Sequence, residues 1–222
     1  NFKTSFGTDW RVVRIPMQSD NGAWPSGSGR YFTYTNASFI NKTIIVPTYN
    51  IAADNNALKI WREACPGYKV IGINSTASIG ASGALHCITH EIGVNDPLLI
   101  THQRQRDTYN TTTPYQLSAT IKHRQGISNA TLYYTTDTTQ SYQSVNMTHI
   151  TGTDVFEAAI PPQPSGTEVF YYIRATSYTN KVQQRPITAP QGFYQFKVLG
   201  TVGVNEQQVE PGGMYPNPSK GI

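Results

Sequence analysis

The sequence predicts an α/β unit followed by an all-β sandwich, because its pattern of apolar and polar residues changes near residue 105. Before that point, β-prone runs surround one segment of helical periodicity. After it, short alternating runs recur without helical periodicity. Only 14% of the 222 residues are charged, and 14 Tyr, 18 Gly and 14 Pro accompany them, which is typical of secreted β-rich proteins. We therefore expect two domains, at 1–105 and 106–199, and a tail at 200–222.

The first segment is expected to open with β-structure. Residues 10–17 (WRVVRIPM) are β-prone, and a Gly- and Ser-rich loop follows them. Further along, two β-prone runs at 38–40 and 43–46 are separated only by Asn-Lys at 41–42, which favours a tight turn. These two runs predict an antiparallel hairpin.

A helix and two further strands are expected after the hairpin. Asp54 can cap the helix, and the Pro-Gly pair at 66–67 ends it. Apolar side chains recur between these points at helical spacing, at Ala57, Leu58, Trp61 and Ala64. The apolar run at 69–73 predicts a buried strand, and 84–92 predicts another. This order of elements is that of an α/β unit built from ββαβ segments.

The second segment shows strands of period two at regular spacing. Apolar residues alternate with polar ones at 117–121, 132–134, 155–160, 169–175 and 194–198. This pattern predicts an immunoglobulin-like β-sandwich. Tyr171 or Tyr172 could supply the hydroxyl of a tyrosine corner, or could be a plain core aromatic. The polar, Gly-rich stretch that follows, 200–213, reads as a linker.

Charge and hydropathy argue against two classes of partner. The net charge is +4 and the basic residues are scattered, with Arg104 and Arg106 the nearest to a cluster, so no nucleic-acid surface is expected. No apolar run approaches the roughly 18 residues that a membrane span needs. The two cysteines, Cys65 and Cys87, could pair as a disulfide in an exported protein.

The sharpest local feature is SGALHCITHEIG, at 82–93. Read as a strand, it places Cys87 on one face and its neighbours His86 and His90 on the other. A thiol flanked by histidines and preceded by a loop of small residues predicts a nucleophilic cysteine, because nearby cationic groups lower the pKa of a thiol and favour the thiolate.

Two other interpretations of this cluster stay open. His86 and His90 have the spacing of a zinc motif, but in a strand they would lie about 13 Å apart, since each residue rises roughly 3.3 Å. Both could not then bind one metal, so neither a metal nor another cofactor is expected. Cys87 could also be a buried, inert thiol beside a surface histidine.

The residues around Cys87 resemble a known family. GALHCITHEI is similar to the catalytic-cysteine segment of the guanidino-group-modifying superfamily, and its A-L-H-C-x-T-H-E stretch to that of Porphyromonas-type bacterial peptidylarginine deiminases. YTNASFINKTIIVP resembles that family's Y-T-N segment and hairpin, and ALKIWREACPGYKVIGI its helix, turn and strand. The resemblance covers roughly 9–105 and implies that 1–105 is the C-terminal part of an α/β-propeller.

The resemblance also implies a reaction and its residues. Cys87 would be the nucleophile that attacks the guanidinium carbon of an arginine side chain, giving a covalent thiouronium and then citrulline. Asn36, in the Y-T-N segment, would orient the substrate, and Ser82 would place a hydroxyl near the guanidinium. The family's His-x-Asp pair is absent from the sequence, so we expect the acid–base groups upstream of Asn1, in an N-terminal part of the same catalytic domain.

The end of the chain suggests where the protein acts. YPNPSKGI, at 215–222, is similar to the start of a sorting domain read by type IX secretion machinery, which implies export to the surface or medium of a Bacteroidetes-like cell. The substrate would be an arginine-containing peptide or a guanidino small molecule, as in agmatine deiminases. A secreted gingipain-type cysteine peptidase and a non-catalytic surface-binding fragment remain alternatives, although the peptidases' downstream cysteine motif is absent.

Overall fold

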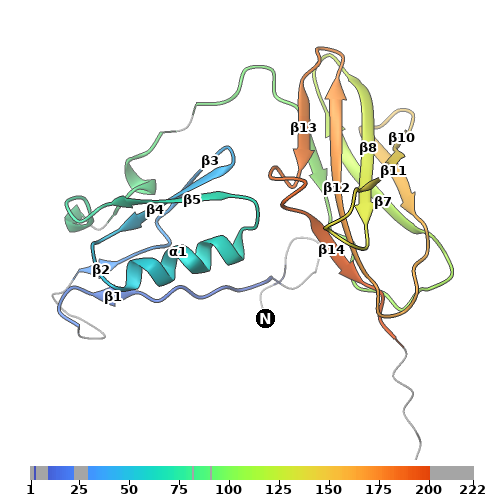
Figure 1. Cartoon of the computed structure of the whole chain (residues 1–222). Coiled ribbons are helices and arrows are strands. Elements are labelled where there is room, and N and C mark those ends of the chain that lie inside the picture. The colour runs from blue at the N-terminus through green and yellow to red at the C-terminus, as the bar shows by residue number, and fades with distance from the viewer. Residues whose placement is uncertain (1–2, 4–9, 23–29, 82, 91, 201–222) are drawn as a thin grey trace, which may run out of the picture.

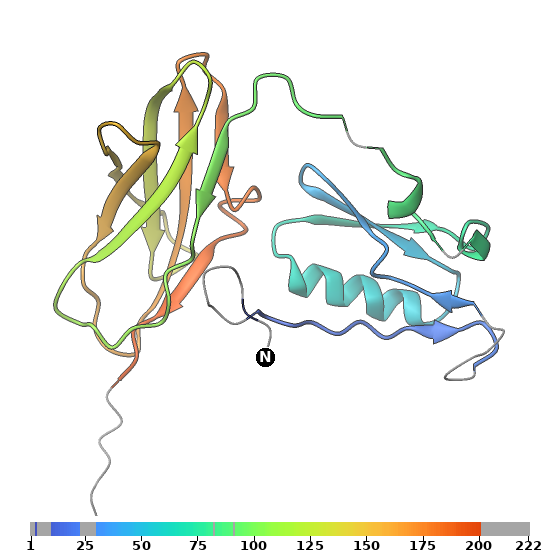
Figure 2. The same ribbon diagram turned by 180° about the vertical axis from the view of Figure 1, so that it is seen from behind.

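The computed structural model describes residues 3, 10–22, 30–81, 83–90 and 92–200. They form an α/β unit with one α-helix and an all-β unit, joined by a connection without regular structure (Figures 1 and 2). No helix within these ranges is long and apolar enough to cross a membrane. The predicted linker and sorting tail lie, beyond Gly200, outside the described residues.

The α/β unit is built on a sheet of order β3-β4-β5. The antiparallel pair β3 (Ser38–Ile40) and β4 (Thr43–Thr48) confirms the predicted hairpin, and Asn41 adopts the left-handed conformation at its turn, with φ 53°. Helix α1 (Ala53–Ala64) then crosses over to β5 (Lys69–Asn74), which pairs with β4 in parallel. This is the expected strand, strand, helix, strand order.

Helix α1 is held by polar contacts at its start that differ from the predicted cap. Ala52 occupies the cap position and makes no side-chain cap bond. Asp54 instead lies in the first turn, where its carboxylate accepts hydrogen bonds from the backbone N–H groups of Tyr49 (3.1 Å) and Ile51 (3.2 Å) and from the Tyr34 hydroxyl (2.8 Å). A carboxylate there also complements the positive end of the helix dipole.

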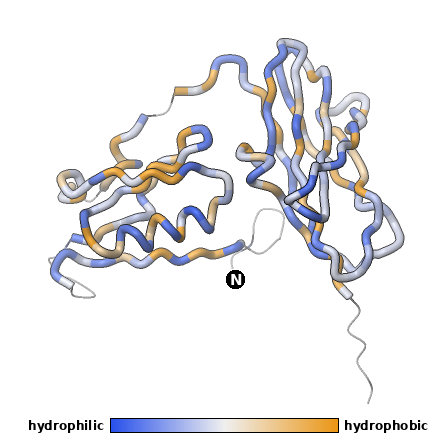
Figure 3. Tube along the Cα trace, in the orientation of Figure 1, coloured by the Kyte–Doolittle hydropathy of each residue, from blue (hydrophilic) through white to orange (hydrophobic). Residues whose placement is uncertain are grey.

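One face of the β3-β4-β5 sheet is packed and the other is not. Ile44 and Val46 are fully buried on the helix side. The strand predicted at 69–73 is present as β5, but the prediction that it is buried is wrong: Ile71 is 36% exposed and Ile73 is 42% exposed, because β5 is an edge strand and both side chains point away from α1. Figure 3 shows how apolar these strands nevertheless are.

The stretch before the sheet also differs from the prediction. Residues 10–17 form no strand, and the strands before the sheet are the short β1 (Gln18–Ser19) and β2 (Tyr31–Phe32), which pair with each other. The apolar side chains of Trp10 and Val12 are 60% and 67% exposed. A β-prone run needs a neighbouring strand to satisfy its backbone, and the described residues give 10–17 none.

The second unit consists of two antiparallel sheets. The first has the order β10-β11-β7-β6 and comprises Thr148–His149, Val155–Ile160, Tyr115–Lys122 and Leu99–His102. The second has the order β13-β12-β8-β9 and comprises Val182–Arg185, Glu168–Ser177, Ile127–Thr135 and Gln143–Asn146, with β14 (Tyr194–Lys197) also pairing with β12. Strand β6 belongs to this unit, so the unit begins before the predicted boundary at 105/106.

The core between these sheets follows the predicted alternation. In β12, Val169, Tyr171 and Ile173 are fully buried, and the residues between them are partly exposed. Leu132 of β8 and Phe196 of β14 pack in the same core. Burying an apolar side chain of this size stabilises the fold by roughly 1.5–3 kcal/mol.

Of the two tyrosines considered for a tyrosine corner, Tyr171 is the one whose hydroxyl makes hydrogen bonds within the core. It accepts a hydrogen bond from the Gln105 backbone N–H (2.8 Å) and lies 2.9 Å from His102 Nε2. His102 Nδ1 lies 2.7 Å from the Ser118 carbonyl oxygen, so the Nδ1–H donates there and Nε2 accepts from the tyrosine. Tyr172 instead stacks on Tyr133, with ring centroids 4.7 Å apart.

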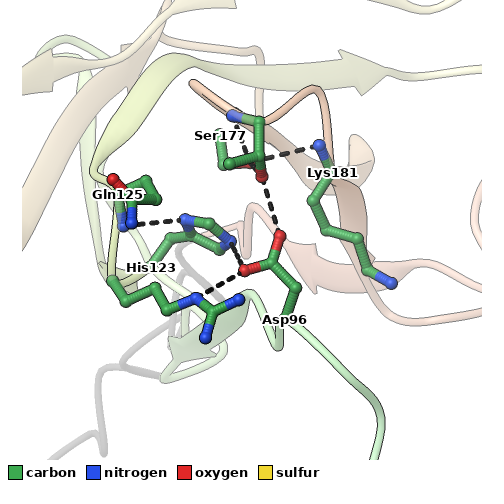
Figure 4. Close-up of polar contacts among 7 residues, drawn as sticks. Asp96, His123, Gln125, Ser177 and Lys181 are labelled. Atoms are coloured by element: carbon green, nitrogen blue, oxygen red, sulfur yellow. Dashed lines mark hydrogen bonds and ion pairs between the residues drawn. The ribbon is translucent and has the colours of Figure 1, made fainter.

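The connection between the units is anchored to the second unit by Asp96 (Figure 4). Its carboxylate lies 2.9 Å from Arg124 Nε and 3.1 Å from His123 Nε2, and it accepts a 2.8 Å hydrogen bond from the Thr179 hydroxyl. The Thr179 bond, followed by His123 and Arg124, lowers the pKa of Asp96. Ser177 Oγ, 2.8 Å from Thr179 Oγ1, holds that hydroxyl in place.

The units also touch at the end of helix α1. Thr188, between β13 and β14, is buried and donates a 3.2 Å hydrogen bond to the Pro66 carbonyl oxygen. Gly67 has a φ of +81°, and a Cβ there would lie 2.8 Å from Thr188 Cβ. The predicted helix-ending Pro-Gly pair therefore has a second use, since only glycine permits both the turn and this approach.

The buried His102 makes stability depend on pH. Burial lowers the pKa of its imidazole, so the unfolded chain binds a proton more readily than the folded one. The free energy of unfolding should therefore fall as pH drops below about 6.5, by at most about 1.4 kcal/mol per pH unit from this group. His102→Gln should flatten this dependence in urea unfolding between pH 7 and 5. His149→Gln, which changes an exposed histidine, is the control. If the free energy of unfolding of His102→Gln changed with pH as steeply as that of the wild type, His102 would not be the source of the pH dependence.

Candidate functional site

Cys87 lies in a short 3₁₀ turn, η2 (His86–Ile88), and not in the strand predicted for 84–92. The turn closes through backbone hydrogen bonds from Ile88 N to Leu85 O (3.1 Å) and from Thr89 N to His86 O (3.3 Å). The two-faced arrangement expected of the histidines and the thiol therefore does not occur. The turn leaves Cys87 exposed.

Asn36 organises this turn. Its Oδ1 accepts hydrogen bonds from the backbone N–H groups of Ala84 (3.0 Å) and His86 (2.9 Å). Because both bonds need an acceptor, the amide orientation is fixed, and Nδ2 donates to Cys87 Sγ at 3.1 Å. This contact fixes the sulfur relative to the Asn36 amide. The structure thus brings together two of the predicted site residues.

Gly83 makes room for the sulfur. A Cβ at this position would lie 2.8 Å from both the Cβ and the Sγ of Cys87, closer than real Cβ atoms approach their neighbours. The third predicted site residue, Ser82, lies outside the described residues. Sequence reasoning identified the small-residue loop but not Gly83, because the need for glycine appears only once the turn has folded back.

A second brace holds the other side of the turn. The buried Ser38 of β3 lies with its Oγ 3.1 Å from the Thr89 hydroxyl oxygen. Thr89 donates its own proton to the His86 carbonyl oxygen at 3.0 Å, so Ser38 is the donor between the two hydroxyls. Asn36 and Ser38 thus bind the turn on either side of Cys87, Asn36 at His86 and Ser38 at Thr89. Sequence reasoning missed this pair, although Thr89 belongs to the quoted motif.

The metal and disulfide interpretations find no counterpart in the described part of the chain. It contains no group of three or more His, Cys, Asp or Glu residues that could hold a metal ion. Both imidazoles, of His86 and His90, are exposed. Cys65 and Cys87 are free thiols, and burial raises the pKa of Cys65, which makes it the less reactive type of thiol.

Replacing Gly83 should disturb Cys87 directly. In Gly83→Ala, the Cys87 side chain must shift from its position beside the Asn36 amide, so alkylation of Cys87 by iodoacetamide should change in rate, and overpacking should cost about 1–3 kcal/mol of stability. Mass spectrometry would follow labelling of Cys87 against Cys65, and urea unfolding would give the stability. Gly93→Ala is the matched control, because its added Cβ meets nothing within 4 Å. Equal behaviour of the two variants would contradict the packing role of Gly83.

Comparisons with known proteins give a family match over the segment that contains Asn36 and Cys87. Residues 1–92 match the model of the family described as Porphyromonas-type peptidyl-arginine deiminase. A putative agmatine deiminase of Marinomonas sp. (strain MWYL1) is 30% identical over 76 residues, which are 34% of this chain and 21% of that protein. One of Lactococcus lactis subsp. lactis (strain IL1403) is 36% identical over 59 residues, 27% of this chain and 16% of that protein.

A solved structure was also found, without sequence likeness. The crystal structure of an engineered protein superposes with a TM-score of 0.33 and 6% identity, covering 64% of this chain and 35% of that chain. The chain spans about a fifth or less of the length of the curated relatives it matches. The family match thus covers residues 1–92, which include Asn36 and Cys87, and corresponds to a Porphyromonas-type peptidyl-arginine deiminase domain.

Proposed function

We propose that this chain carries the nucleophile of a guanidino-group deiminase acting on arginine side chains. One observation supports this most directly: Cys87 Sγ lies 3.1 Å from Asn36 Nδ2, within the residues that match the deiminase family. A cysteine that is exposed and whose sulfur is fixed by an N–H donor has the access and the positioning that a nucleophile needs.

The proposed reaction uses the thiolate of Cys87 twice. The sulfur attacks the guanidinium carbon and forms a C–S bond; the tetrahedral adduct then expels ammonia, which leaves after gaining a proton, and a thiouronium remains on the enzyme. Water adds to the same carbon, the C–S bond breaks, and citrulline and the thiolate are released. Asn36 holds the sulfur in position throughout, because its amide is fixed by two backbone N–H groups.

Proton transfer in this reaction needs groups besides Cys87. The described part of the α/β unit contains three carboxylates, and each already has a partner: Asp20 pairs with Arg30 at 3.1 Å, Asp54 binds backbone N–H groups at the start of α1, and Glu63 lies 3.8 Å from Lys59. We therefore propose that a further part of the catalytic domain supplies the acid–base groups and packs on the uncovered face of the sheet. Parallel pairs such as β4-β5 are normally covered on both faces.

The place of that further part is indicated by exposed side chains. Ile40, Ile71 and Ile73 lie on the sheet face opposite α1 and are 47%, 36% and 42% exposed. Ser38 lies on the same face and braces the Cys87 turn. A segment covering the isoleucines would thus lie close to the turn.

Export is a separate proposal. It rests on the YPNPSKGI sequence and its likeness to the start of a sorting domain of type IX secretion. These residues lie outside the described part of the chain. A protein acting outside the cell would meet arginine in peptides, which favours peptidyl-arginine over a small guanidino compound as substrate.

Citrulline formation tests the proposed activity. In the longer protein that contains the whole catalytic domain, Cys87→Ser should lower citrulline release by about 10³-fold or more, as expected when a nucleophile is removed. Cys65→Ser should leave it unchanged. An arginine peptide and agmatine, assayed side by side, would give the substrate preference. Activity that survives Cys87→Ser, or hydrolysis of an arginyl anilide in place of citrulline release, would overturn the proposal.

The uncovered face can be tested by one substitution in two settings. In the present chain, Ile71→Glu should change the free energy of unfolding by no more than about 0.5 kcal/mol, because the side chain is partly exposed at a sheet edge. In the longer protein, the same change should reduce citrulline release by about tenfold or more, because it would place a charge in an apolar contact. Val182→Glu, in the second unit, is the control. If Ile71→Glu left citrulline release in the longer protein at the level of Val182→Glu, a covering segment at Ile71 would be excluded.

A further inference from the structure

The second unit carries a groove that the proposed reaction does not use. It lies between the β8–β9 and β13–β14 connections and has a volume of ≈ 640 Å³. Two rings, of Tyr142 and Phe193, line it together with the amides of Gln140 and Gln191. Hydroxyl groups at 138, 139 and 141 complete its polar lining.

The rings of the groove are held by a second row of aromatic side chains. Tyr142 packs edge-on to Tyr172, with ring centroids 5.1 Å apart, and Tyr172 in turn stacks on Tyr133. Phe193 packs edge-on to Phe170, with centroids 4.9 Å apart. Because these contacts already fix the rings, a ligand would lose little free energy to the ordering of side chains. The arrangement is that of a preformed binding surface.

Two further observations bear on the occupant. No residue that lines the groove is charged, and both connections that form it lie in the described part of the chain. The Tyr142 hydroxyl is buried and finds no hydrogen-bond partner among the described residues, which is uncommon for a buried hydroxyl. The groove therefore offers ring faces, amides and hydroxyls to a ligand, without any charge to pair with an ion.

We propose that this groove binds a neutral carbohydrate chain. A sugar ring has one apolar face of C–H groups, which packs on an aromatic ring, and a rim of hydroxyls, which bond to amides and hydroxyls. Tyr142 and Phe193 would supply the ring contacts, and Gln140 and Gln191 the polar ones. A charged ligand is disfavoured, because it would lose its hydration without gaining a counter-charge.

Calorimetric titration of the whole 222-residue chain tests the proposal. The probes are cellohexaose, maltohexaose and the hexamer of N-acetylglucosamine, with an acidic hyaluronan oligosaccharide and a proline-rich decapeptide for comparison. At least one neutral hexamer should bind, with a Kd of about 10 μM to 1 mM. Phe193→Ala and Tyr142→Ala should each weaken that binding about tenfold or more, as for a ring at the centre of a contact.

Controls separate loss of binding from loss of folding. Tyr109→Ala removes an exposed tyrosine of the same unit that does not line the groove, and should bind as the wild type does. Gln140→Ala changes an exposed groove residue without touching the core, and should weaken binding while leaving the unfolding midpoint unchanged. The proposal is overturned if no neutral hexamer binds, if Gln140→Ala binds normally, or if only the acidic oligosaccharide or the proline-rich peptide binds.

Discussion

The side-chain amide of Asn36 is the interaction on which the site depends. It joins two segments that lie 51 residues apart, through one bond to the Cys87 sulfur and two bonds from backbone N–H groups of the turn. Without it, those N–H groups would need other partners, because an unpaired backbone group is costly when water cannot reach it. The same contact therefore shapes the turn and orients the donor that faces the sulfur.

Much of the fold could be predicted because its patterns are local. The hairpin with Asn41 at its turn, the spacing of apolar residues in α1 and the alternation along β12 all appear in the structure. The strand expected at 84–92 does not, because a distant side chain, Asn36, takes the N–H groups that a neighbouring strand would have needed. An alternating sequence specifies a strand only where another strand is available to pair with it.

The site itself could be predicted only in part. A motif resemblance pointed to Cys87 and Asn36, and the structure places them in contact. Gly83 and the Ser38–Thr89 pair could not be found this way, because their importance lies in contacts made across the folded chain. The exposure of Ile71 shows a related limit, since an apolar strand indicates that burial is favourable but not which segment provides it.

The Asp96 anchor limits the length of the connection between the Cys87 turn and the second unit. The turn that holds Cys87 is fixed at Thr89 by Ser38, and the second unit is fixed at Asp96 by Thr179 and Arg124. Six residues lie between 89 and 96, and the seven residue-to-residue steps reach at most about 25 Å. Whatever the second unit binds would therefore stay near the thiol, at a distance limited by this tether and by the size of the unit itself.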